Sequence, residues 1–277
     1  MAVTPLEFQY VQTLVHAYAA IVLDPGKEYL VESRLTPLAR DEGFETIGRM
    51  IDTIRNKPIN GMHRKVVDAM TTNETSFFRD IHPFEAMRHQ IIPNLIARRK
   101  KERRLNIWCG AASTGQEPFS LAMLLREYFP ELVGWSVKIV ATDLNKEVLD
   151  RARSGRYRQM DVNRGLPAPL LVKYFRQRAT MWELREEVRN LVEFRELNLA
   201  LAWPAMPTPD LILLRNVMIY FDVVTKKAIL ARLHGLLAPD GYLMLGSAET
   251  TMNLDDRFDR TVFGKAVSYS IRPGTRG

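Results

Sequence analysis

The sequence predicts an α/β protein in which a doubly wound parallel sheet follows an all-helical N-terminal segment. From Leu105 onward, short apolar runs alternate with amphipathic helical stretches, which is typical of parallel strands joined by crossover helices. The first run leads into a turn of small residues and then directly into a helix, within Trp108 to Ser120 (WCGAASTGQEPFS). A strand, tight turn and helix in this order predict a cofactor site.

The first seventy residues show helical patterns and no strand pattern. Thr4-Pro5-Leu6-Glu7 combines a capping box with a proline in the first helical turn. Further helical patterns cover Lys27 to Ala39, Thr46 to Arg55 and Gly61 to Met70. We expect a helical domain over residues 1–72, then a linker and lid helix over 73–104.

The strands of the α/β domain, expected over residues 105–277, can be read as six apolar runs. They are Leu105 to Cys109, Val137 to Ala141, Val192 to Leu197, Asp210 to Arg215, Gly241 to Gly246 and Ala266 to Ile271. A small β-rich insertion is expected at about 156–190. Because no glycine occurs from Leu166 through His234, we expect any hairpin there to use a looser turn than the Asn-Gly type.

The turn after the first strand lacks the residues that bind phosphates. Gln116 and Glu117 stand where a P-loop has Lys and Ser or Thr, and Ala112 replaces the second glycine of the dinucleotide fingerprint. Asp143 ends the second strand, where a carboxylate can accept hydrogen bonds from both hydroxyls of a ribose. A nucleoside without phosphate suggests S-adenosylmethionine.

Purely structural readings of these acids stay open at this point. Thr114 and Glu117 fit a capping box for the following helix, and Asp143 with Asn145 fits a helix cap. A helix over about Pro83 to Lys100 should run antiparallel to the first strand. It would bring Thr71 to Arg79 over the strand ends as a polar lid; the alternative is a plain linker.

Composition is that of an ordinary globular protein, with 46% hydrophobic and 26% charged residues and a single cysteine. No apolar stretch approaches about 18 residues, so we expect no membrane insertion, and the cytoplasm is the expected location. The net charge of +7 comes from two clusters. One is Arg49, Arg55, Lys57, Arg64 and Lys65; the other is Arg98 to Arg104, which we expect at the opposite edge of the sheet. Such clusters favour an anionic partner or form a solvated face.

Five motifs, in order, resemble the chemotaxis receptor glutamate methyltransferases of the CheR family. They are TTNETSFFRD, AASTGQEPFS, ATDLN, LVEFRELNL and LILLRNVMIYFD, and the resemblance covers nearly the whole chain. In that family a helical domain precedes a Rossmann-like, S-adenosylmethionine-dependent methyltransferase domain that carries a small β-subdomain. The resemblance implies a cytoplasmic signal-transduction enzyme that methylates glutamate carboxylates of chemoreceptors and releases S-adenosylhomocysteine.

The resemblance also implies a set of cofactor contacts and no metal site. The implied cofactor-binding residues are Asn73, Thr75, Arg79, Glu117, Asp143, Asn198, Leu199, Arg215 and Asn216. Arg79 and Tyr220 are candidates to orient the reactants, although Tyr220 also reads as a packed aromatic residue. Gln116 departs from the family, which commonly has a second glutamate there. Because the insertion is short and lacks glycine from Leu166 onward, we expect no dependence on docking of a receptor C-terminal peptide.

Carboxylate methylation needs no general base, since a glutamate with a pKa of about 4.3 is already ionised at neutral pH. The expected partner of the Arg49 to Lys65 cluster is the acidic methylation helices of receptors. Two alternatives remain: a nucleic-acid methyltransferase, favoured by the pI near 9.5, and a non-catalytic module that binds S-adenosylmethionine. The net negative helical segment, with 8 basic and 9 acidic residues, argues against nucleic acid.

Overall fold

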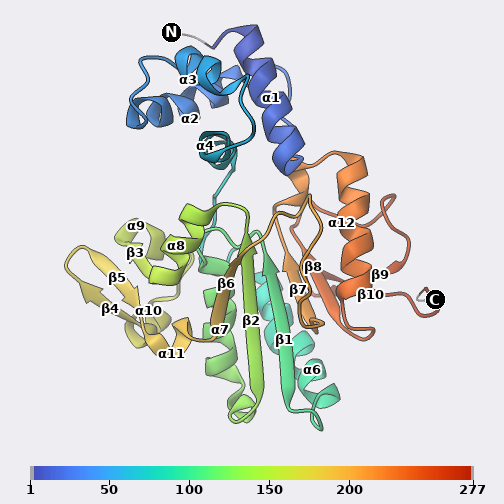
Figure 1. Cartoon of the computed structure of the whole chain (residues 1–277). Helices are drawn as coiled ribbons and strands as arrows, with labels where there is room; N and C mark the ends of the chain where they lie inside the picture. Colours follow the sequence, from blue (N-terminus) through green and yellow to red (C-terminus); the bar gives the residue numbers. More distant parts are fainter. Residues whose placement is uncertain (1–2, 276–277) are drawn as a thin grey trace. The chain divides into compact units, whose positions relative to one another are not determined.

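The computed structural model describes residues 3–275, which form two compact units (Figure 1). The first unit comprises the chain up to Thr72 together with Asn198–Ala202 and Tyr220–Lys226. The second comprises the remaining described residues. Within residues 3–275, no helix is long and apolar enough to cross a membrane.

Four helices build the first unit, in the positions that the sequence predicts. They are α1 (Pro5–Ala19), α2 (Glu28–Asp41), α3 (Ile47–Ile54) and α4 (Gly61–Met70). The predicted capping box starts α1: Thr4 accepts a hydrogen bond from the Glu7 amide, and the Glu7 carboxylate accepts one from the Thr4 amide. Fully buried side chains come from all four helices: Val11, Val15, Val31, Leu35, Met50, Ile51, Val66 and Val67. The unit therefore has an apolar core of its own.

A seven-stranded sheet forms the centre of the second unit, in the order β6-β2-β1-β7-β8-β10-β9. Its strands are β1 (Arg104–Gly110), β2 (Ser136–Asp143), β6 (Val192–Glu196), β7 (Leu211–Leu214), β8 (Tyr242–Leu245), β9 (Phe258–Phe263) and β10 (Ala266–Ile271). The five strands from β6 to β8 are parallel. The strand order reverses between β1 and β7, which is where open α/β sheets bind their ligands.

The prediction of an entirely parallel sheet was wrong at one edge. β10 pairs antiparallel with β8 and with β9, so the last two strands form a hairpin. β9 has no apolar run that would predict it, because most of its side chains, including Asp259 and Arg260, are exposed or only partly buried. An edge strand that is solvated on its outer side does not have the continuous apolar run of a central strand.

The main helices of the second unit are α7 (Gln116–Tyr128), α8 (Lys146–Ser154) and α12 (Val223–Leu236), the last of which begins within the first unit. Short 3-10 turns are η2 (Pro130–Leu132) and η3 (Met218–Tyr220). The single helix predicted over Pro83 to Lys100 is divided into α5 (His82–Ala86), a π-helical turn η1 (Met87–Ile91) and α6 (Ile92–Arg98). Pro93 lacks an amide hydrogen, so the regular hydrogen-bond ladder cannot continue through this point.

The insertion between β2 and β6 contains a separate three-stranded antiparallel sheet. Its elements are β3 (Arg156–Arg158), α9 (Gln159–Val162), α10 (Ala168–Tyr174), β4 (Phe175–Arg178), β5 (Met181–Leu184) and α11 (Glu186–Arg189). The expectation of a loose turn was wrong. Arg178 pairs with Met181, so the hairpin closes with two residues, and Ala179 adopts a φ of +52°. A non-glycine residue thus takes the left-handed conformation that this turn requires.

The basic cluster Arg98 to Arg104 lies at the amino end of β1, as the sequence predicts. Arg99 forms ion pairs with Asp210 at 2.6 Å and with Asp240 at 2.5 Å, and Asp210 also accepts the Asn106 amide. These carboxylates raise the pKa of the Arg99 guanidinium. The ion pairs of Arg99 therefore connect the end of α6 to the residues that precede β7 and β8, at the sheet edge opposite the predicted ligand site.

Candidate functional site

The turn between β1 and α7 adopts an alternating backbone conformation. Ala111, Ser113 and Gly115 have φ values of +53°, +50° and +90°, whereas the residues between them do not have positive φ. Gly110 permits a close approach to β7, because a Cβ there would lie 2.6 Å from Leu214 Cδ1. The Ala112 amide donates to the Thr142 carbonyl and the Gly115 amide to the Ala112 carbonyl, whereas the Ser113 amide between them is directed to a carboxylate.

Asp143, at the carboxyl end of β2, places its carboxylate against this turn. The carboxylate accepts hydrogen bonds from the Ser113 amide at 2.8 Å and the Asn145 amide at 3.0 Å. Burial raises the Asp143 pKa, and the backbone amides of Asn145, Ser113 and Leu144 oppose that shift. The cap of α8 is the Asn145 side chain, which accepts from two helix amides, so the reading of Asp143 as the cap was wrong. Each carboxylate oxygen keeps acceptor capacity for a hydroxyl.

Glu117 does not form the capping box with Thr114. α7 begins after Gly115 without a side-chain cap, and Thr114 instead contacts the Gln116 side chain. The Glu117 carboxylate pairs with Arg215 at 2.5 Å, with side-chain exposures of 13% and 1%. Arg215 also contacts Asp80 at 2.9 Å. A nearly buried ion pair therefore joins the start of α7 to the end of β7.

The segment from Asn73 to Asp80 packs on the same turn, rather than forming a plain linker. Ser113 Oγ donates to the Asn73 carbonyl, and the Phe78 amide donates to Ser120 Oγ, both at 2.9 Å. Phe77 is fully buried. The Arg79 side chain donates a hydrogen bond to the Glu74 carbonyl, and the Arg79 carbonyl accepts one from Arg215. The Thr75 side chain is half-buried.

Seven of the predicted site residues lie in the second unit: Asn73, Thr75, Arg79, Glu117, Asp143, Arg215 and Asn216. Asn198, Leu199 and Tyr220 belong to the first unit: Asn198 donates to the Tyr18 carbonyl, and the Tyr220 carbonyl accepts the Val22 amide. The roles of these three residues, like those of the seven in the second unit, stay predictions.

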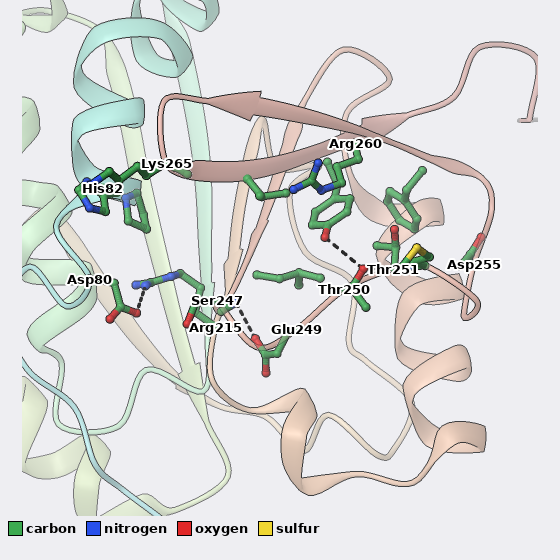
Figure 2. A pocket seen from close by; sticks show the side chains of 18 of the residues that line it. Asp80, His82, Arg215, Ser247, Glu249, Thr250, Thr251, Asp255, Arg260 and Lys265 are labelled. Atoms are coloured by element: carbon green, nitrogen blue, oxygen red, sulfur yellow. Dashed lines mark hydrogen bonds and ion pairs between the residues drawn. The ribbon is translucent and has the colours of Figure 1, made fainter.

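Three residues that were not predicted contact the predicted site residues: Asp80, Ser113 and Glu249. Asp80 contacts Arg215, and the Ser113 amide donates to Asp143. Neither contact can be predicted from the local sequence pattern. Glu249 follows β8 and accepts the backbone amides of Asn216 and the two residues after it. A cavity of about 920 Å³ lies beside Arg215 and Glu249, and its walls include the loop after β8 and the β9–β10 hairpin (Figure 2).

The residues present suit a nucleoside ligand without phosphates. Two acids, Asp143 at the carboxyl end of β2 and Glu117 at the start of α7, lie beside the turn after β1, where they would repel a phosphate chain. Asp143 retains acceptor capacity for a diol, and Arg215 Nε is buried without a hydrogen-bond partner among the described residues. S-adenosylmethionine combines such a diol with an amino-acid portion, so the donor set fits it.

We predict that cofactor affinity rises with pH through the raised pKa of Asp143. Hydroxyl donors stabilise the ionised carboxylate, so binding lowers this pKa and releases a proton; affinity must therefore fall as the carboxyl group becomes protonated. Titration calorimetry from about pH 4.5 to 7.5 measures this change. The variant Asp143→Asn should bind weakly and without this pH dependence. Wild-type affinity that is constant over the range would contradict the assignment.

Comparisons with known proteins identify the family. Residues 73–266 match the model described as CheR methyltransferase, SAM binding domain, and residues 6–71 match CheR methyltransferase, all-alpha domain. Chemotaxis protein methyltransferase 1 of Pseudomonas aeruginosa is 37% identical over 98% of this chain and 100% of its own length. Chemotaxis protein methyltransferase Cher2 of Pseudomonas putida is 36% identical over the same shares. The Escherichia coli chemotaxis protein methyltransferase is 36% identical over 96% of this chain and 91% of its own. The chain belongs to the CheR methyltransferase family.

Proposed function

We propose that this enzyme transfers the methyl group of S-adenosylmethionine to glutamate side-chain carboxylates of chemoreceptors, for sensory adaptation. The observation that carries the proposal is the pair of acids Asp143, at the end of β2, and Glu117, at the start of α7, in a chain that matches chemotaxis methyltransferases over nearly its full length. When bound, the cofactor supplies an activated methyl group on a sulfonium. The protein then has to bind, orient and desolvate the reactants.

Each residue of the site has a proposed part in that task. Asp143 binds the ribose hydroxyls, and Glu117 lies on the side of the methionine portion, held by Arg215. Further proposed contacts come from Asn73, Thr75, Arg79, Asn198, Leu199 and Asn216. Arg79 and Tyr220 orient the reacting groups. Since the acceptor glutamate is ionised at neutral pH, catalysis comes from proximity and alignment, which can supply about 7 kcal/mol or more.

The proposed domains are a helical receptor-facing domain over residues 1–72, a lid segment and helix over 73–104, and the methyltransferase domain over 105–277. The β-subdomain at about 156–190 has a short two-residue hairpin without glycine. We propose that methylation by this enzyme does not depend on docking of a receptor C-terminal peptide. Deleting that peptide from a receptor substrate should leave the methylation rate unchanged.

Labelling with methyl-tritiated S-adenosylmethionine tests the reaction. Receptor-bearing membranes should acquire label that mild base releases as methanol, because a glutamate methyl ester is hydrolysed under these conditions. DNA and RNA incubated in parallel should acquire none. Base-stable label on nucleic acid would contradict the proposal and indicate a nucleic-acid methyltransferase. Cofactor binding without any methyl transfer would indicate a non-catalytic module.

The proposed receptor-facing surface is the basic cluster of the first unit, Arg49, Arg55, Lys57, Arg64 and Lys65. Lys65 pairs with Glu42, and Arg64 donates to the Tyr18 hydroxyl at 3.1 Å. Arg55 and Lys57 are exposed, and the Arg55 guanidinium lies 5.7 Å from the Tyr10 ring centroid. Exposed cations of this kind accelerate encounter with an acidic helix.

We predict that reversing the charge at Arg55 and Lys57 weakens receptor methylation without weakening cofactor binding. In Arg55→Glu/Lys57→Glu, kcat/KM for receptor should fall about tenfold at low ionic strength, and the difference should shrink with added salt. The matched control is Lys100→Glu/Lys101→Glu, which reverses two exposed charges in the other basic cluster. Equal rates for the first variant and wild type at low salt would exclude this surface.

A further inference from the structure

Glu249 lies on the loop after β8, beside the cavity and outside the five motifs quoted above (Figure 2). Its carboxylate accepts hydrogen bonds from four backbone amides. Oε2 accepts from Asn216 at 2.8 Å and from Gly246 at 2.6 Å. Oε1 accepts from Val217 at 2.8 Å and from Met218 at 2.7 Å. One side chain therefore ties the loop after β8 to the segment that follows β7.

The four amides form a nest that needs an anion. Asn216 has a φ of +59°, and the amides of Asn216, Val217 and Met218 precede or begin the 3-10 turn η3, where helical turns leave donors without partners. Successive amides arranged around a left-handed residue make an anion-binding concavity. A carboxylate satisfies all four donors, whereas a neutral amide side chain offers only one oxygen.

Close packing around Gly246 supports the same function. A Cβ on Gly246 would lie 2.7 Å from Glu249 Oε2 and 2.8 Å from the Asn216 amide nitrogen. Both are fixed by hydrogen bonds, so neither can move without breaking the nest. In the loop after β8, Gly246 therefore allows the backbone of Asn216 to lie close, and the Glu249 carboxylate accepts the amides of both residues.

We infer that Glu249 is a positioning residue: by filling the nest, its carboxylate fixes the backbone of Asn216 so that this residue can bind the cofactor, and it anchors the turn that leads to Tyr220. The inference rests on the proposed role of Asn216. Glu249 itself contacts no reacting atom. Its loss should therefore act through cofactor binding and alignment rather than through receptor recognition.

The variant Glu249→Gln tests the inference with little change of volume. Its amide group faces two amide donors, so two of the four hydrogen bonds are lost and the nest opens. We expect the KM for S-adenosylmethionine to rise about 10-fold to 100-fold, the range expected for loss of charge-assisted hydrogen bonds. The KM for receptor should stay unchanged. The matched control is Asp256→Asn, an exposed carboxylate on the same loop that also lines the cavity, which should behave as wild type.

Chemical rescue separates positioning from a general structural role. In Glu249→Ala, sodium acetate supplies a carboxylate that can occupy the emptied nest, so activity should recover with acetate and not with sodium chloride at equal ionic strength. Gly246→Ala should not be rescued, because its added Cβ occupies the space. An unchanged cofactor KM in Glu249→Gln overturns the inference, as does absence of acetate rescue in a folded Glu249→Ala. If Glu249→Ala does not fold, the KM result in Glu249→Gln decides.

A separate variant tests whether Asn216 is a cofactor ligand at all. Asn216→Ala should weaken cofactor binding in calorimetry if Asn216 is a ligand. Normal binding by Asn216→Ala would overturn that ligand assignment, and with it this inference. Weak binding by Asn216→Ala together with normal kinetics of Glu249→Gln would overturn the positioning function of Glu249 alone.

Discussion

Replacing Arg215 with methionine should lower the free energy of unfolding by about 3–5 kcal/mol, the cost of leaving a buried charge without its partner. The Glu117 carboxylate is 13% exposed and has Arg215 as its ion-pair partner, so the substitution removes the charge that balances it. Urea unfolding followed by tryptophan fluorescence measures the effect. All four tryptophans, Trp108, Trp135, Trp182 and Trp203, lie in the second unit, so the signal reports this unit.

Two further variants make that prediction specific. Arg215→Met/Glu117→Gln should recover most of the lost stability, because no unpaired charge is then buried. Arg195→Met, which breaks an exposed pair with Glu193, should cost less than about 1 kcal/mol. If Arg215→Met lowers the free energy of unfolding by less than about 1 kcal/mol, or if the double variant recovers none of the loss, the Arg215–Glu117 ion pair does not stabilise the fold.

Replacing Asp143 with alanine should abolish useful cofactor affinity. The carboxylate offers acceptors to two ribose hydroxyls and also holds the Ser113 and Asn145 amides, so we expect the Kd for S-adenosylmethionine to rise at least about 100-fold, from hydrogen bonds to a charged group worth about 1.5–3 kcal/mol each. Calorimetry with cofactor and with S-adenosylhomocysteine measures it. Asp150→Ala, an exposed carboxylate on α8 paired with Arg153, is the matched control. Equal affinity of Asp143→Ala and this control would remove Asp143 from the site.

The central strands were predictable because they are buried on both faces. Leu211–Leu214 and Tyr242–Leu245 are buried at every position, so each reads as an uninterrupted apolar run. β9 was not predictable from the same signal, since its outer edge is solvated. The two-residue hairpin was missed because turn chemistry favours glycine at left-handed positions, and Ala179 adopts one without it.

Some site residues could likewise be predicted from the local sequence, whereas others depend on contacts between distant parts of the chain. Asp143 could be placed from the sequence, because the end of a parallel strand fixes which edge of the sheet it occupies. The capping-box interpretation of Glu117 was as consistent with local spacing as the ligand interpretation. The structure excludes the capping box, because Glu117 pairs with Arg215, 98 residues away, and the role of Glu117 as a cofactor ligand stays a prediction. The four amides bound by Glu249 include three that are 31 to 33 residues distant in sequence. Such pairings follow from strand order, which local patterns do not specify.

The most direct test of the central claim is mass spectrometry of receptor peptides after incubation with the enzyme and S-adenosylmethionine. The wild-type enzyme should form a methyl ester on glutamate side chains of the receptor cytoplasmic region, and Asp143→Ala should not. The ester should disappear after mild base treatment. Receptor peptides that remain unmodified with active, cofactor-bound enzyme, or methyl groups found on residues other than glutamate, would contradict it.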